Sequence, residues 1–163
     1  MRNIRFLAFS LLLGASIVLG GQIACAGGSP PTEISWSVDL PANWLAPGVC
    51  AFPINVSVSG NAATIILPGN RSIITAPGQQ AVVTNLADPS KSVQLNIPGT
   101  FHQTTKQNGD VVTVVTGRNL LGDPQAGFVL AIGTFSYIFD SSGNLIQPLT
   151  GKGKLNDVCA MIQ

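Results

Sequence analysis

Side chains that could carry acid–base or metal chemistry are few in this chain. His102 is the only histidine among 163 residues, and histidine is the usual general base at neutral pH. It stands in the polar segment 101–105, which is typical of an exposed strand histidine. The sequence contains no Gly-x-Ser-x-Gly, HExxH, CxxC, Walker A or Rossmann glycine pattern. A hydrolase triad, a zinc centre and a nucleotide-binding loop therefore have no support, and we expect no cofactor.

Arg118 and Asp123 are the other candidates for a site. They flank the segment 117–124, which is otherwise uncharged and contains two Gly, one Pro and two Leu, and which we predict to be a loop. In one interpretation Arg118 pairs with an anionic group of a ligand at the mouth of the fold. In the interpretation we favour, Arg118 and Asp123 bridge each other across the loop.

A calcium site near Asp140 and Asn144 is the only metal site that the residues suggest. The spacing does not match the EF-hand pattern, and Asp, Ser, Gly and Asn are ordinary turn residues. We therefore predict a turn there and no metal ion.

Charge is unusually sparse. Only 9% of the residues are charged and 45% are hydrophobic, with a formal net charge of +1. Disordered chains combine low hydrophobicity with high charge, so this composition indicates a folded domain. No cluster of Lys and Arg is present, so we expect no nucleic-acid partner.

Residues 1–26 have the pattern of a secretory signal peptide. Arg2 and Arg5 precede an apolar run over residues 6–19, and Ala24 and Ala26 are small residues suited to cleavage before Gly27. We predict a secreted, periplasmic or cell-envelope protein with no membrane span after cleavage. A lipid anchor on Cys25 is the alternative, although Gln22 replaces the Leu of a bacterial lipobox.

Cleavage would leave two cysteines, Cys50 and Cys159. An even pair in an exported protein predicts a disulfide. The bond would close a loop of about 110 residues, and the chain-entropy model gives it about 4–5 kcal/mol. The chain after residue 26 keeps six Lys or Arg against seven Asp or Glu.

The rest of the chain has the pattern of many short strands. We divide it into a Gly/Pro-rich N-terminal segment, residues 27–49, whose Trp36 and Trp44 we expect to pack onto the fold, and a single β-domain, residues 50–163. Apolar and polar residues alternate over 54–58 and 92–97, which is typical of half-buried strands.

Turn residues recur every 8–12 positions and predict eight to ten short strands. We expect turns at Gly60 and at Asn108–Gly109, a bend, bulge or tight turn at Gly133, and a last strand over 154–162. The predicted fold is all-β, an antiparallel barrel or a barrel-like sandwich, closed by the disulfide between its first and last strands.

Three segments carry a resemblance to known sequences: CAFPI at 50–54, TGRNLL at 116–121 and DVCA at 157–160. With them the chain resembles a group of small exported bacterial proteins that have no assigned activity. The resemblance implies the same pairing of Cys50 with Cys159, and it implies no catalytic or binding residue.

These observations favour an exported, non-catalytic β-domain with a recognition or structural role. It would bind a small molecule, a glycan or a protein surface, with Arg118 as the anchor. One alternative is a barrel enzyme, for instance an isomerase or lyase, that uses His102 or Asp123. Another is an inhibitor of a secreted enzyme, or a structural protein of the cell envelope. Asn55 and Asn70 lie in glycosylation sequons, which matter only in a eukaryotic host.

Overall fold

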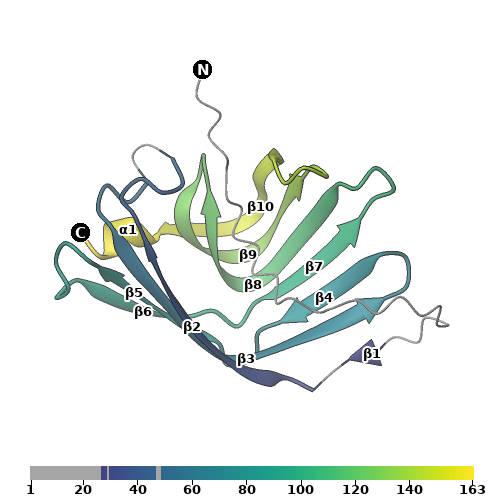
Figure 1. Ribbon diagram of the computed structural model, residues 1–163, viewed down its shortest axis with the longest axis horizontal. Helices are drawn as coiled ribbons and strands as arrows, with labels where there is room; N and C mark the ends of the chain where they lie inside the picture. The colour runs from purple at the N-terminus through teal and green to yellow at the C-terminus, as the bar shows by residue number, and fades with distance from the viewer. Residues whose placement is uncertain (1–26, 29, 47–48) are drawn as a thin grey trace.

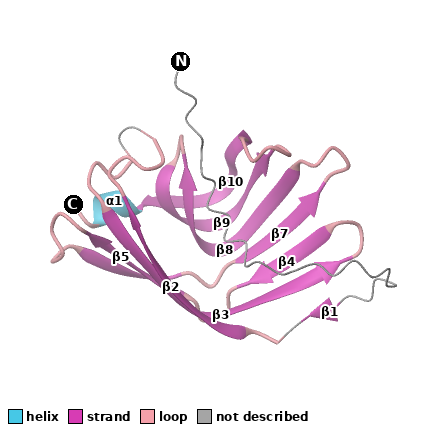
Figure 2. Ribbon diagram, viewed as in Figure 1, coloured by secondary structure: helices cyan, strands magenta, loops and turns pink. Residues whose placement is uncertain are grey.

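The computed structural model describes residues 27–28, 30–46 and 49–163, and about two thirds of them lie in strands (Figure 2). The prediction of an all-β fold is confirmed. The proposed signal peptide, residues 1–26, lies outside the described residues. Among those described, no helix is long and apolar enough to span a membrane. The elements are β1 (Gly27–Gly28), β2 (Thr32–Leu40), β3 (Ile54–Leu67), β4 (Arg71–Thr75), β5 (Gln80–Asn85), β6 (Ser92–Asn96), β7 (Thr100–Thr105), β8 (Val111–Asp123), β9 (Gly127–Phe139), β10 (Leu145–Asp157) and α1 (Val158–Met161).

All strand pairs are antiparallel, and one long strand, β3, belongs to two sheets. Its first part pairs with β2 and β5, and β5 pairs with β6; these strands form the small sheet. Its second part pairs with β1 and β4, and β7, β8, β9 and β10 follow in order to form the large sheet. Figure 1 shows β3 running along the base of both sheets. Every residue of β2 pairs with β3, so the N-terminal segment 27–49 contributes a strand to the small sheet.

The sheet is not closed, so of the two predicted architectures the closed barrel is wrong, and a barrel-like sandwich describes the fold only loosely. The strand order runs β10-β9-β8-β7-β4-β3-β5-β6, with β10 and β6 at its two ends. Closure would require these ends to pair. Instead, the hairpin of β8 and β9 curls over and packs on the small sheet (Figure 1).

Glycines lie inside the strands, where the sequence predicts turns. β8 continues unbroken through residues 117–123, so the loop expected at 117–124 is wrong, and Gly60 lies within β3. Gly117, Gly133 and Gly153 pair with one another across β8, β9 and β10, and each has a positive φ. We call these three the glycine row.

The strands bend at the glycine row without a bulge. The register of β8 with β9 is continuous on both sides of Gly133. A Cβ atom on Gly133 would lie 2.8 Å from the Cα atom of Gly153 and closer still to the carbonyl oxygen of Lys152. Only glycine permits this approach and this backbone conformation. The bend predicted at Gly133 is thus present, as part of a continuous strand.

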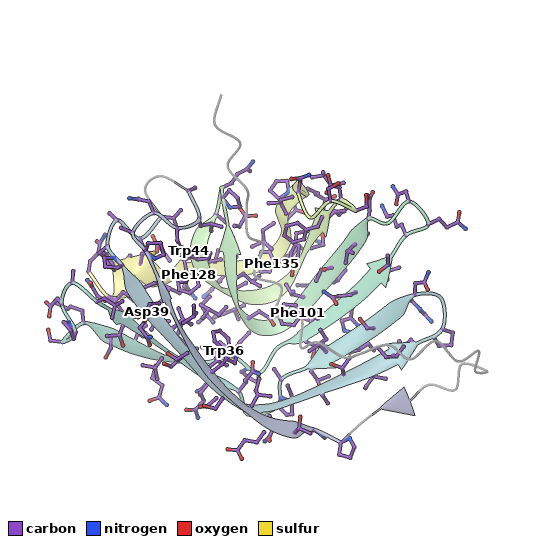
Figure 3. All side chains as sticks on the ribbon, viewed as in Figure 1. Trp36, Asp39, Trp44, Phe101, Phe128 and Phe135 are labelled. Atoms are coloured by element: carbon purple, nitrogen blue, oxygen red, sulfur yellow. A yellow bond between two sulfur atoms is a disulfide. The ribbon has the colours of Figure 1, made fainter. Side chains whose placement is uncertain are left out.

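The first core lies between the small sheet and the curled end of the β8–β9 hairpin. The ring of Trp44 meets that of Phe128 edge-on, with centroids 6.0 Å apart (Figure 3). Trp36 also packs against this core, so the prediction for both tryptophans is confirmed. The buried members are Cys50, Ile54, Val56, Val58, Ala81, Val83, Leu95, Ile97, Phe128, Leu130, Val158, Cys159 and Ile162.

A second core lies on the inner side of the curl. Val115 and Phe135 pair across β8 and β9, and Phe101 of β7 packs beside them (Figure 3). Leu121, Val129 and Ala131 complete its buried part. The β8–β9 hairpin therefore buries one face in each core.

The predicted disulfide is present: Cys50 bonds to Cys159, with 5.1 Å between their Cα atoms. Its place in the fold differs from the prediction, because it does not join the first and last strands. Cys50 precedes β3, and Cys159 lies in α1. The last strand stops at Asp157 because the Asp157 carboxylate caps this helix, accepting from the backbone N–H of Ala160 at 3.2 Å.

Candidate functional site

The structure separates the three side chains that the sequence singles out. His102 is exposed on β7, Arg118 is half-buried in the middle of β8, and Asp123 is buried at the end of β8. Arg118 and Asp123 are five positions apart on one strand, so they point to opposite faces of the sheet. The three do not converge on one site.

Both carboxylate oxygens of Asp123 accept hydrogen bonds from backbone N–H groups. It is only 4% exposed, and its Oδ1 accepts from the N–H groups of Gln125 and Ala126, each at 2.8 Å. Its Oδ2 accepts from the N–H of Leu149 at 2.9 Å. The carboxylate therefore shapes the β8–β9 turn and ties the curled hairpin to β10. This explains why the predicted bridge between Arg118 and Asp123 is wrong: each side chain has other partners.

Arg118 reaches across to the small sheet. Its Nε donates to the backbone carbonyl of Asn96, at the end of β6, at 2.8 Å. Within the described part of the chain, no hydrogen bond occupies its terminal guanidinium nitrogens. One nitrogen thus fixes the side chain, while the two that can grip a carboxylate or phosphate in a bidentate manner remain available.

An open depression of about 410 Å³ lies beside this guanidinium. Its other lining residues offer amide side chains and backbone groups rather than charges, and they are Gly78, Gln79, Gln80, Asn96 and Pro98. Arg118 is thus its one ionic group. The sequence pattern did not single out the two glutamines.

The rim of the depression is held in place by the backbone. The N–H of Ala76 donates to the carbonyl of Gly99 at 3.1 Å, and the N–H of Ile97 donates to the carbonyl of Gln79 at 2.9 Å. These bonds join the β4–β5 turn to the crossover between the two sheets. A Cβ atom on Gly99 would overlap the side chain of Asn119, so the crossover lies directly against β8. The depression is therefore preformed.

Comparisons of the chain with protein-family models, with curated proteins and with solved structures found no match. What the site can do must therefore follow from its geometry.

The outer face of the small sheet is a second polar surface. The Nδ2 group of Asn55 donates to the Asp39 carboxylate at 2.7 Å and to the Ser37 hydroxyl at 2.9 Å, and Ser37 and Ser57 share a hydrogen bond of 2.8 Å. These polar side chains of β2 and β3 therefore form hydrogen bonds with one another. A glycan attached to the Asn55 sequon would replace one of the two Nδ2 hydrogens, so at least one of these two bonds would be lost.

In the turn between β9 and β10, the carboxylate of Asp140 accepts hydrogen bonds from other residues of the same turn. Asp140 accepts from the side chain and the backbone of Asn144 and from the N–H of Ser142, at 2.8–2.9 Å. These hydrogen bonds, the Asn144 side chain first, hold the pKa of Asp140 below its ordinary value. No group of three or more His, Cys, Asp or Glu residues in the described ranges is arranged to hold a metal ion.

Proposed function

We propose that this protein is an exported, non-catalytic recognition domain that binds the anionic group of a small polar ligand in the Arg118 depression. The observation that carries the proposal is the guanidinium itself. Its Nε is fixed to Asn96, its outer nitrogens are available, and amide groups surround it in a preformed hollow. That arrangement suits the carboxylate of an acidic sugar, whose hydroxyls can bond with Gln79 and Gln80.

The positions of the other candidate residues favour binding over catalysis. A general base must be able to reach the proton it removes. His102 and Asp123 lie on opposite faces of the large sheet, and the Asp123 oxygens accept three backbone N–H groups. No observation favours the isomerase or lyase alternative in which one of them acts in an enclosed pocket.

Export is the second part of the proposal. Disulfides persist in oxidising compartments, and an intramolecular bond between Cys50 and Cys159 is compatible with an extracellular or periplasmic location. The pattern of residues 1–26 supports the same route. Detection of a mature protein that begins at Gly27 in the secreted or periplasmic fraction would test it.

The binding site is tested with galacturonate as the probe and galactose as its uncharged counterpart. Backbone amide signals of Gly78, Gln79 and Gln80 should shift with galacturonate and stay in place with galactose. Arg118→Ala should abolish the shifts. Lys91→Ala is the matched control, because it removes one positive charge from a turn that does not line the depression.

Equal shifts in the wild type and in Arg118→Ala would refute the site. Loss of binding in both Arg118→Ala and Lys91→Ala would show that positive charge in general, rather than the depression, is responsible, and would also refute it.

A further inference from the structure

Positively charged residues that are far apart in the sequence lie together on the outer face of the large sheet. This is the face that points away from the second core. Residues paired across neighbouring strands point to the same side of a sheet. The register therefore places on this face Arg71 of β4, His102 of β7, Arg118 of β8 and both Lys152 and Lys154 of β10. Four of the six Lys and Arg residues in the described chain thus share one surface.

No residue that the strand register places on this face is acidic. Up to the row of Arg118, its other members are apolar β-branched residues, a glutamine, and hydroxyl-bearing residues that follow one another across the strands. Beyond that row the same face turns into the first core. Thr75, Thr100, Thr116 and Thr134 form one such row, and it ends at Lys152. Thr104, Ser136 and Thr150 stand in the neighbouring rows.

The surface is broad, and it is hollowed beside Lys152. Four strand spacings separate β4 from β10, which makes it about 19 Å wide. A shallow depression of about 290 Å³ on β8–β10 is lined by Lys152, by the hydroxyl residues Thr134, Ser136 and Thr150, and by Val114, Phe135 and Gly151. Lys154 follows Lys152 on the same face, about 7 Å along the strand.

We infer that this face binds an acidic polysaccharide, a polymer of sugars that carry carboxylate or sulfate groups. The exposed ammonium groups of Lys152 and Lys154 would pair with successive anionic groups, and the threonine hydroxyls would bond with sugar hydroxyls. The strand rows of the face contain no acidic residue to offset its lysines and arginines. The inference goes beyond the Arg118 depression, because the two lysines that carry it do not line that depression.

An anionic membrane fits the same surface less well. Proteins that lie on membranes usually insert Trp, Phe or Leu side chains and carry dense clusters of about four to eight Lys or Arg. The exposed residues of this face within the described ranges include no aromatic ring other than His102, and the charges are spread among hydroxyls. A broad surface with rows of hydroxyls matches a polysaccharide chain instead.

The test measures binding of the purified full-length protein to polygalacturonate, to uncharged dextran and to phosphatidylglycerol vesicles. We expect binding to polygalacturonate that weakens as NaCl is added, because salt screens exposed charges. Lys152→Gln with Lys154→Gln should weaken it about tenfold, since each exposed charge pair contributes on the order of a factor of three.

The matched control is Lys91→Gln with Lys106→Gln, which removes the same charge from lysines in turns, outside the strand rows of this face. It should change the affinity less than twofold, and urea unfolding should confirm that both variants are folded. Equal losses in the two pairs would overturn the inference, and so would equal binding to dextran. Binding to the vesicles but not to polygalacturonate would also overturn it, in favour of a lipid surface.

Discussion

Replacing Gly133 with Ala tests the account of how the large sheet bends. The new methyl group would press on the carbonyl oxygen of Lys152 and lie 2.8 Å from the Cα atom of Gly153. The backbone φ of 140° is a conformation that only glycine adopts freely, and holding another residue there costs about 1–3 kcal/mol. Forcing extra atoms into a packed site adds about 1–3 kcal/mol. We therefore expect the free energy of unfolding to fall by about 4 kcal/mol.

Gly143→Ala is the matched control for this change. Gly143 also has a positive φ, 81°, but a Cβ atom there would meet nothing within 4 Å. Its substitution should cost only about 1 kcal/mol, the strain of a left-handed conformation. The difference of about 3 kcal/mol between the variants then belongs mainly to the close approach of β9 and β10.

Urea unfolding followed by the fluorescence of Trp36 and Trp44 measures both variants. With a slope of about 2 kcal/mol per molar urea, the midpoint of Gly133→Ala should lie about 1.5 M below that of Gly143→Ala. If the two midpoints coincide, the strands do not approach closely at the glycine row, and our explanation of the bend is refuted.

Three further predictions concern the rest of the fold. Serine at both Cys50 and Cys159 should lower the free energy of unfolding by about 5 kcal/mol, the chain-entropy estimate for the loop they close, and reduction of the wild type should reproduce this loss. Asp123→Asn should cost about 2 kcal/mol in the same assay, because the amide nitrogen cannot accept from the N–H of Leu149, and a variant as stable as the wild type would contradict this. The pKa of Tyr137 should lie above 10.0, chiefly because burial disfavours the phenolate, an effect that the neighbouring hydroxyl of Thr113 offsets only in part. Since this is the only tyrosine, absorbance titration reports it directly, and stability should fall as the pH rises through 10 because the unfolded chain ionises first.

Alternation and turn chemistry were enough to predict the class of fold. Val56 and Val58 point into the first core while Asn55 and Ser57 point outward, as the pattern indicates. The hairpin at Asn108 and Gly109 also lies where it was predicted. These features depend on neighbouring residues only, so one sequence suffices to find them.

Glycine was the main source of error. Read along the sequence, Gly60 and Gly117 look like the ends of strands, because glycine usually marks a turn. In the fold each lies within a strand where backbones approach closely: a Cβ atom on Gly60 would lie 2.7 Å from the Cα atom of Gln79. The need for glycine comes from a segment distant in sequence, so no local pattern reveals it.

Arg118 was predicted as the anchor of a site, but the residues around it and the charged face of the large sheet escaped prediction for a related reason. Arg118 lies beside Gln79 only because the chain crosses between sheets at Pro98, and Arg71 shares a face with Lys152 only through the pairing of five strands. Charges that are separated by dozens of residues become neighbours through register, and the sequence does not specify which strands pair.

The double membership of β3 has a consequence for how the molecule unfolds. Residues 54–59 hold the small sheet together and residues 63–67 belong to the large sheet, so a single backbone segment is the structural centre of both. Neither sheet can lose this segment without exposing the first core or the edge of β4. The two sheets should consequently melt as one cooperative unit, and the amide protons of β3 should be among the last to exchange with solvent.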